Sequence, residues 1–153
     1  MRAVVQRVSN ASVSVDGGVV SHIGRGLLVL AAVGREDTDA DLQYIVEKTV
    51  RLRIFPDDEG RFDRSVLDVG GSLLVVSQFT LYGDVRRGRG PSFTASAPPA
   101  EAEERFAALV ECFRATGVPT ETGRFQAMMD VALVNDGPVT MILDSADRHR
   151  PRN

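Results

Sequence analysis

The chain has 153 residues, one cysteine, two histidines and a formal net charge of −3. This length fits one domain and is sufficient to bury an apolar core without a disulfide or a structural metal. One cysteine cannot form an internal disulfide, and no C-x-x-C pair is present for a thiolate zinc site, so we expect neither a metal nor another cofactor. The mild acidity excludes a protein that coats nucleic acid non-specifically.

Targeting and membrane features are weak in this sequence. The longest apolar run, residues 27–33, is far shorter than the ~20 residues that a membrane-spanning helix needs. Polar side chains interrupt the first seven residues before a secretory core could form. We therefore expect a cytoplasmic protein with no membrane partner.

The first third of the chain has the pattern of β-strands. Apolar and polar residues alternate through 2–8 and 11–15, and Asp16-Gly17-Gly18 predicts a hairpin turn into a strand over 19–23. Residues 26–33 are continuously apolar, which is typical of a strand buried on both faces.

Two segments, 37–53 and 100–116, have the period of an amphipathic helix. The apolar face predicted for the first consists of Leu42, Ile45, Val46, Thr49 and Val50. The apolar face predicted for the second consists of Ala102, Phe106, Leu109, Val110 and Phe113. Acidic residues crowd the first turn of both segments, where they suit the helix dipole.

The remaining elements complete a β-rich pattern. We predict a strand over 72–81, a loop over 83–99, and two strands, 128–134 and 139–143, joined by a turn. The sequence thus predicts an α+β fold, with one domain over residues 1–146 that has largely antiparallel sheets in a barrel-like arrangement and two amphipathic helices. Residues 147–153 are polar, and we expect them to form a frayed C-terminal tail.

The sequence lacks the common signatures of catalysis. It contains no phosphate-binding G-x-x-x-x-G-K-[ST] loop, no G-x-S-x-G elbow and no H-E-x-x-H motif. His22 and His149 are the only histidines, and we do not expect a Ser-His-Asp triad.

One polar segment, Ser77-Gln78-Phe79-Thr80-Leu81, directly follows four aliphatic residues of a predicted strand. The simpler interpretation is a strand that emerges into solvent. The functional interpretation is the floor of a polar pocket, where hydroxyls, an amide and backbone N–H groups hold an ester carbonyl or an oxyanion.

A second segment is Asn135-Asp136-Gly137-Pro138-Val139-Thr140. Asn-Asp-Gly alone predicts a hairpin turn, but Pro138 lacks an N–H and cannot join a central ladder at that point. A cis bond is not expected from residue statistics, because only about 5–6% of X-Pro bonds in folded proteins are cis.

Two arginine clusters are candidates for binding nucleic acid. Arg86, Arg87 and Arg89 lie on a glycine-rich loop that ends near Phe93, and they fit either a phosphate backbone or a solvated loop. Arg148, Arg150 and Arg152 form a second and weaker candidate.

Taken together, these segments resemble the D-aminoacyl-tRNA deacylases of the bacterial and eukaryotic type. The matching parts are residues 1–8, 77–81, 86–93 and 135–140, and the resemblance extends to about residue 145. Each motif is short, but their combination at this spacing is specific.

The resemblance implies a homodimer with its active site at the subunit interface. The family hydrolyses the ester between a D-amino acid and tRNA, acts on glycyl-tRNA and rejects L-aminoacyl-tRNA. The implied catalytic residues are Ser77, Gln78, Phe79 and Thr80. The implied residues for substrate binding and chiral selection are Asn135, Gly137, Pro138, Val139, Thr140 and Phe125, with Gly137-Pro138 as a cis peptide that reaches into the partner's pocket. Arg86, Arg87 and Arg89 are the implied tRNA-binding residues.

Three positions depart from the family pattern. Gly90 stands where the family often has arginine, and Gln126 and Met128 replace the glycine and the acidic or polar residue often found after Phe125. We expect weaker RNA contact at Gly90 and a changed pocket wall at the other two, without loss of activity.

The expected mechanism relies on orientation, because an aminoacyl ester is already labile. We expect backbone N–H groups around Phe79 and Thr80 to stabilise the oxyanion, with the tRNA 2′-hydroxyl as a participant. Thr80 as a covalent nucleophile is an alternative. Two other functions stay open: a non-catalytic RNA-binding module that uses the 86–89 loop, and a metal-free esterase of small D-amino esters.

Overall fold

A single long strand, β1 (Arg2–Val15), runs through the molecule and organises its sheet. The structure is a computed structural model that describes residues 1–152. The first half of β1 pairs antiparallel with β3 (Gly26–Ala32), and its second half pairs antiparallel with β2 (Gly18–Ile23). On its other side, β1 pairs with β8 (Asp130–Asp144) along nearly its whole length.

The sheet continues beyond β3 through two parallel pairings. β3 pairs with β6 (Ser72–Ser77), and β6 pairs with β7 (Thr120–Thr122). Each parallel step needs a crossover, and the two helices supply it: α1 (Asp39–Arg51) connects β3 to β6, and α2 (Pro99–Ala115) connects β6 to β7. A small separate hairpin consists of β4 (Phe55–Pro56) and β5 (Phe62–Arg64).

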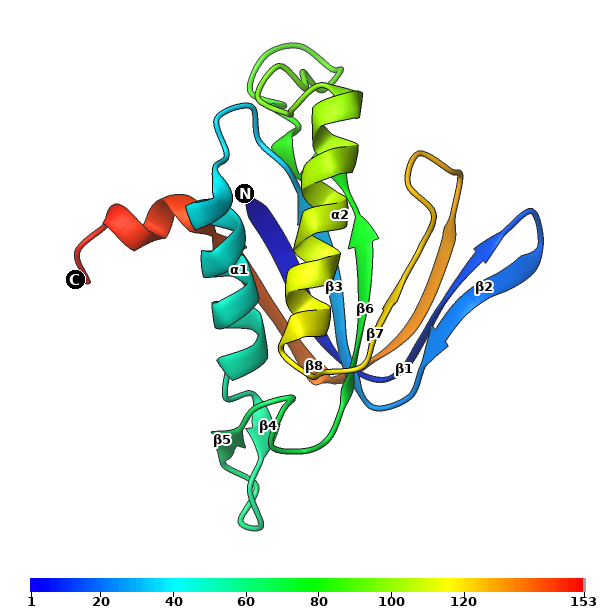
Figure 1. The fold of residues 1–153 in the computed structure, drawn as a ribbon, viewed down its shortest axis with the longest axis vertical. Coiled ribbons are helices and arrows are strands. Elements are labelled where there is room, and N and C mark those ends of the chain that lie inside the picture. The colour runs from blue at the N-terminus through cyan, green and yellow to red at the C-terminus, as the bar shows by residue number, and fades with distance from the viewer. Residues whose placement is uncertain (153) are drawn as a thin grey trace.

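The sheet curls far enough for β2 to lie against β6 and β7 (Figure 1). This nearly closed, barrel-like mixed sheet with two helices confirms the predicted α+β class. The pairings of β1 are antiparallel, as expected, whereas the two helical crossovers make the β3–β6–β7 part parallel. Among residues 1–152, no helix is long and apolar enough to cross a membrane.

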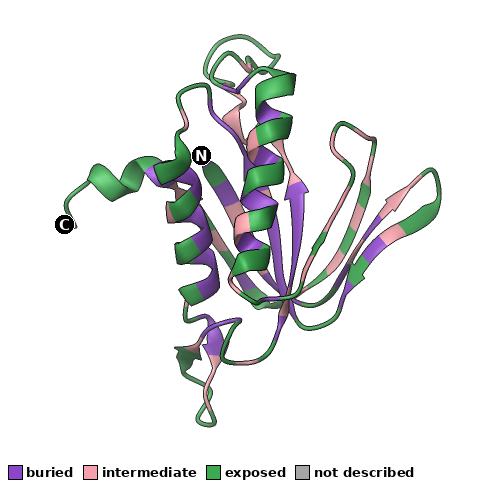
Figure 2. Cartoon of the chain, in the orientation of Figure 1, coloured by how far each residue is buried: buried purple, intermediate pink, exposed green. Residues whose placement is uncertain are grey.

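Apolar residues fill both faces of the sheet. Between the sheet and the helices, Leu27 and Val29 of β3 pack with the inner faces of α1 and α2, while Leu28 points into the second core inside the curled sheet. Figure 2 shows this arrangement as buried inner helix faces over buried central strands. The prediction that 26–33 contains a strand buried on both faces is confirmed.

Both predicted helix faces are confirmed. The buried residues of α1 include all five that the period selected, and the buried residues of α2 are the five predicted. The predicted hairpin turn also forms, with Asp16 at φ 52° and Gly17 at φ 79° between β1 and β2. Positive φ at both positions fits the short turns that match the twist of paired strands.

Four sequence-based expectations about elements were wrong. Residues 2–8 and 11–15 belong to one strand. Residues 135–138, predicted as a turn between two strands, lie within β8, where residues 136–139 form a bulge. The strand predicted to reach residue 81 ends at Ser77, and a 3₁₀ helix, η1 (Phe79–Tyr82), follows it. The expected frayed tail contains a 3₁₀ helix, η2 (Ser145–His149); Asn153 lies outside the described residues.

Gly26→Ala tests the close approach of β3 to β6. A Cβ atom at Gly26 would lie 1.8 Å from the backbone oxygen of Ser72, whereas one at Gly24 would meet nothing within 4 Å. Because the obstacle is backbone, we expect the free energy of unfolding to fall by at least ~1–3 kcal/mol, as in overpacked cores. Urea denaturation measures this loss, with Gly24→Ala as the matched control. Equal stability of the two variants would contradict the close approach.

Candidate active site

The polar segment after β6 turns sharply out of the sheet. Ser77 is the last residue paired with β3, opposite Ala31, and the Gln78 amide still donates to the Ala31 carbonyl at 2.8 Å. The chain then leaves the ladder as η1, and Phe79 and Thr80 are exposed. The sequence prediction of polar groups at an accessible strand end therefore agrees with the geometry.

Two backbone donors at this turn are available to a ligand. Among the hydrogen bonds of residues 1–152, neither the Phe79 N–H nor the Thr80 N–H donates to a protein acceptor. They are the first amides of η1, where a helix leaves its donors without partners. The Gln78 side-chain amide donates to the Thr80 hydroxyl at 2.5 Å and so orients that side chain. These exposed donors can bind a developing negative charge.

The arginine loop folds back onto η1. Phe93 packs edge-on against Phe79, with ring centroids 5.0 Å apart, and Asp84 and Ser92 exchange two backbone hydrogen bonds of 2.8 and 2.9 Å at the base of the loop. The loop is thereby held beside the free amides of η1.

The three arginines of this loop differ in their pairing. Arg86 donates to both carboxylate oxygens of Asp84, at 2.6 Å for the closest contact, and these bonds lower the pKa of Asp84 to about 2. Within residues 1–152, no ion pair involves Arg87 or Arg89, and both are exposed. Arg87 and Arg89 are therefore better placed to bind phosphate than Arg86.

The second motif forms a large bulge in β8. In the β1–β8 ladder Gln6 is opposite Thr140 and Val8 is opposite Asn135, so Arg7 alone faces the four residues 136–139. The peptide bond between Gly137 and Pro138 is cis, as the resemblance implied, and both residues are exposed.

The Arg7 side chain binds the backbone of this bulge. Its Nε donates to the Asp136 backbone oxygen at 3.2 Å and lies 3.2 Å from the Asp136 carboxylate, while Nη1 donates to the Ile54 carbonyl at 2.6 Å. The side chain is buried, and its guanidinium lies 5.6 Å from the centre of the Phe62 ring. A charged group buried with this many partners fixes the backbone it contacts.

Asn135 closes the bulge from the other end. Its Oδ1 accepts from the Val139 N–H at 3.2 Å, and its Nδ2 donates to the Thr140 hydroxyl at 3.0 Å. Val139 is buried in the core next to the helices, so the bulge is anchored on both sides of Gly137 and Pro138. The structure thus brings together Asn135, Val139 and Thr140, and their role in substrate binding stays a prediction.

The two motifs lie apart within one chain. Arg2 donates to the Leu81 carbonyl in η1 at 3.2 Å, whereas Arg7 donates to the bulge at 3.2 Å. These two arginines are five residues apart on one strand, which corresponds to about 17 Å at 3.3–3.4 Å per residue. A single small ester cannot contact both motifs of one chain at this separation.

Phe125, Gln126 and Met128 do not belong to the bulge. The Phe125 ring lies 6.0 Å from the ring of Phe106 on α2 and is half-buried, so packing accounts for it; its role in substrate binding stays a prediction. Gln126 has a φ of 62°, a left-handed conformation that favours glycine, and Met128 is 91% exposed.

Arg7 and Arg2 are not among the site residues predicted from the sequence. Arg7 had a detectable signal, since it shares the buried phase of its strand with Ala3 and Val5. Arg2 had no such signal in the sequence. It bridges Leu81 and Asp144 and lies over the Tyr82 ring, 4.6 Å from its centre.

The Tyr82 hydroxyl cannot act as a base at neutral pH. Burial, followed by the charge of Asp37, raises the pKa of Tyr82 well above its ordinary value.

Comparisons with known proteins identify the family of this chain. A family model for D-Tyr-tRNA(Tyr) deacylase matches residues 4–144. The chain belongs to this family. A D-aminoacyl-tRNA deacylase of Roseiflexus castenholzii is 60% identical over 100% of this chain and 98% of its own length. One of Desulfitobacterium hafniense is 60% identical over 95% of this chain and 97% of its own.

Two solved structures are also similar. One, named c-Myc DNA unwinding element binding protein, has a TM-score of 0.90 and 43% identity over 94% of this chain and 98% of its own. A probable eukaryotic D-amino acid tRNA deacylase shares the fold, with a TM-score of 0.74 and 21% identity over 94% of this chain and 98% of its own. The sequence-based family identification is confirmed, and with it the classification of the chain as a hydrolase.

Gly137→Ala tests the bulge as part of the deacylase site. Gly137 has a φ of 125°, and a Cβ atom there would lie 2.8 Å from Val139 Cγ2 and 3.0 Å from an Arg7 nitrogen. We expect deacylation to fall by ~10²-fold, because a shift of about 1 Å in a positioning group has effects of this size. Gly117→Ala is the control, since Gly117 also has a positive φ, 86°, but open space around it and a place outside both motifs. Normal activity of the Gly137 variant would contradict this role.

Proposed function

We propose that this chain hydrolyses the ester bond of D-aminoacyl-tRNA, and that a homodimer forms the active site. The observation that carries the proposal is the pair of free N–H groups at Phe79 and Thr80, exposed at the end of β6 in a chain of the deacylase family. Two such backbone donors can form an oxyanion hole.

The chemistry needs no side-chain base at this position. Of the two histidines, His22 is exposed on β2 and His149 lies in η2, so neither belongs to η1 or to the bulge. In our proposal, water attacks the carbonyl carbon, and the Phe79 and Thr80 amides stabilise the resulting oxyanion. The bond to the ribose 3′-oxygen then breaks, and the water proton reaches that oxygen through the neighbouring 2′-hydroxyl. The products are the D-amino acid and tRNA.

Rejection of L-aminoacyl groups follows in this proposal from the exposed bulge. The bulge is held by Arg7 on one side and Asn135 on the other, so it presents fixed backbone at Gly137 and Pro138. A fixed backbone that holds the α-amino group leaves space for a D side chain toward solvent and excludes an L side chain. Glycyl-tRNA has no side chain to exclude and is therefore expected to be a substrate.

The homodimer supplies the second half of the site. Because η1 contacts Arg2 and the bulge contacts Arg7, about 17 Å further along β1, we propose that the bulge of one chain completes the site at η1 of another. In residues 1–152, β8 pairs with β1 alone, which leaves its second edge open, and Val134 and Ile142 on this strand are 54% and 79% exposed. Open edges and exposed apolar side chains favour association.

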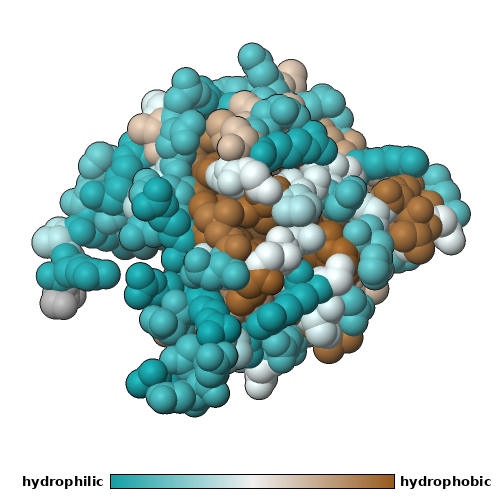
Figure 3. All heavy atoms as spheres, turned by 60° about the horizontal axis from the view of Figure 1, so that its bottom comes forward, coloured by the Kyte–Doolittle hydropathy of each residue, from teal (hydrophilic) through white to brown (hydrophobic). Residues whose placement is uncertain are grey.

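The lower face of the molecule also has an apolar surface (Figure 3). Figure 3 brings the lower part of Figure 1 forward and shows apolar side chains gathered at the centre of this face, bordered by hydrophilic ones.

We propose in addition that Arg87 and Arg89 contact tRNA phosphates, and that the enzyme acts in the cytoplasm, where aminoacyl-tRNA is used.

The direct test is deacylation of matched substrates by sub-stoichiometric protein. We expect D-tyrosyl-tRNA and glycyl-tRNA to be cleared while L-tyrosyl-tRNA stays intact, and a 2′-deoxy terminal adenosine to abolish turnover. Equal rates on the D and L substrates would refute chiral selection. Unchanged rates on the 2′-deoxy substrate would remove the 2′-hydroxyl from the mechanism.

Substitutions at Thr80 separate the backbone donor from the hydroxyl. Thr80→Pro removes the N–H at a first-turn position where a helix tolerates proline, and Thr80→Val keeps the N–H and removes only the hydroxyl. We expect the proline variant to lose ~10²–10³ in kcat, the usual effect of one oxyanion donor, and the valine variant to lose much less. Equal losses would favour Thr80 as a nucleophile instead.

Mixing two inactive variants tests the shared site. In a heterodimer of Thr80→Pro and Gly137→Ala, one site carries both changes and the other carries neither. Random exchange of subunits should then restore about a quarter of the wild-type activity, because half of the dimers are mixed and each has one intact site. If η1 and the bulge of the same chain formed the site, mixing would restore nothing.

Two observations favour a second candidate function, nucleic-acid binding without catalysis. The 43% identical solved structure is named for binding a DNA element, and the 86–93 loop carries two arginines with no ion pair in residues 1–152. A non-catalytic nucleic-acid-binding module would protect D- and L-aminoacyl-tRNA alike. An esterase of small D-amino esters would show no dependence on the tRNA or on salt.

A further inference from the structure

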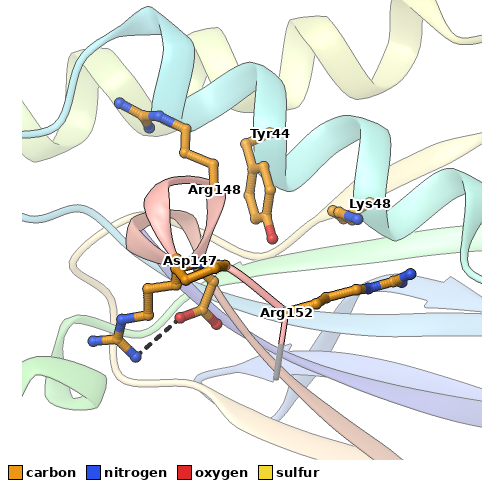
Figure 4. A pocket seen from close by; sticks show the side chains of 7 residues that line it. Tyr44, Lys48, Asp147, Arg148 and Arg152 are labelled. Atoms are coloured by element: carbon orange, nitrogen blue, oxygen red, sulfur yellow. Dashed lines mark ion pairs between the residues drawn. The ribbon is translucent and has the colours of Figure 1, made fainter.

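A basic cavity of about 570 Å³ lies between α1 and the C-terminal segment, far from the arginine loop in sequence (Figure 4). Tyr44 and Lys48 of α1 line one side. The residues that line the other side are Asp147, Arg148, Arg150, Pro151 and Arg152. Four cationic side chains therefore surround the opening with one carboxylate. We call this feature the basic cavity.

The C-terminal segment is fixed to α1 at the edge of the basic cavity. The Ser145 hydroxyl donates to Asp41 at 2.7 Å, and Arg148 forms an ion pair with the same carboxylate. Burial disfavours the charged carboxylate, but hydrogen bonds from Ser145, Thr38 and Arg148 outweigh it and hold the pKa of Asp41 well below its ordinary value. Asp41 thus stays ionised at neutral pH and keeps the segment in place.

Only part of the positive charge is neutralised within the protein. Arg148 is paired with Asp41, and Arg150 with Asp147 at 3.1 Å, the contact dashed in Figure 4. In the part of the chain that the structure describes, no carboxylate pairs with Lys48 or Arg152. Lys48 lies instead over the Tyr44 ring, 5.6 Å from its centre. Two cations and an aromatic ring are thus available to a ligand.

Two contacts of Arg2 join the C-terminal segment to the candidate active site. The segment begins at Asp144, whose carboxylate accepts from Arg2 at 3.2 Å, and Arg2 also donates to the Leu81 carbonyl in η1 at 3.2 Å. A polynucleotide whose 3′ end lies at η1 must continue over the neighbouring surface. The family model ends at residue 144, so most of the cavity's cations lie beyond the part of the chain that it matches.

We propose that the basic cavity binds the phosphodiester backbone of the tRNA acceptor arm while the ester lies at η1. Lysine supplies a point charge, arginine a planar fork of donors, and the aromatic ring a surface for a base or ribose, a combination that suits a nucleic-acid strand. The inference rests on the proposed function, because that function brings the tRNA to η1.

The test removes the two available cations together, as Lys48→Ala with Arg152→Ala. The control variant, Arg51→Ala with Arg114→Ala, removes the same charge from exposed arginines that already pair with Glu47 and Glu111. The substrates are full-length D-tyrosyl-tRNA and a D-tyrosyl ester of the terminal CCA trinucleotide, which is too short to reach beyond the site.

We expect the basic-cavity variant to raise KM for full-length tRNA, to leave kcat unchanged and to cleave the trinucleotide ester normally. The slope of log kcat/KM against log salt should weaken by ~0.7–0.9 for each phosphate that the variant no longer neutralises. An unchanged KM and salt slope would overturn the proposal, and an equal defect on the trinucleotide would show that the cavity acts through η1 and not on RNA.

Binding of uncharged tRNA, measured by filter retention, keeps this proposal separate from the catalytic one. We expect weaker retention by the basic-cavity variant than by the wild type or the control variant, whether or not the protein deacylates its substrate. Equal retention by all three proteins would refute the basic cavity as an RNA contact. If the wild type retained tRNA but hydrolysed neither ester, the proposed function would fail while this inference stood.

Discussion

Arg7 is the single residue of β1 that faces four residues of β8, and the candidate site depends on this mismatch. Apart from a smaller shift between Val8 and Asn10, the rest of the ladder pairs in regular register, which uses the backbone groups of both strands and leaves them unable to bind a ligand. At the bulge, residues 136–139 leave the ladder, and the Arg7 guanidinium takes the place of the missing strand partner by binding the Asp136 carbonyl. The result is an exposed backbone segment with a fixed shape.

The other half of the site uses the same principle at a strand end. β6 stops pairing at Ser77, and η1 turns the next amides away from the sheet. Donors that a longer strand would have used in its ladder are thereby exposed. Such backbone elements suit the recognition of chirality, because every amino acid has the same backbone and a side-chain pocket would recognise the variable group instead. The scarcity of histidine, lysine and cysteine is consistent with chemistry that depends on orientation.

Positive charge without a partner is distributed unevenly over this acidic chain. Most arginines are paired with nearby carboxylates, as Arg86 is with Asp84 and Arg148 with Asp41. The basic residues without an ion pair in residues 1–152 include Arg87 and Arg89 on the loop beside η1 and Lys48 and Arg152 at the basic cavity. A net charge of −3 therefore coexists with two local surfaces that suit phosphate.

Much of this protein was determined by the sequence itself. The helix faces, the doubly buried β3 and the hairpin at Asp16 and Gly17 follow from local periodicity and turn chemistry, which depend on neighbours in the chain. The two site motifs were also visible, because polar residues in an apolar strand and proline in a ladder break local rules. Only the tertiary structure decided that residues 136–139 form a bulge, that η1 follows Ser77 and that Arg7 and Arg2 hold the two motifs. Those outcomes depend on which segment lies opposite, and contacts between residues 79 and 129 positions apart leave no periodic trace in either segment.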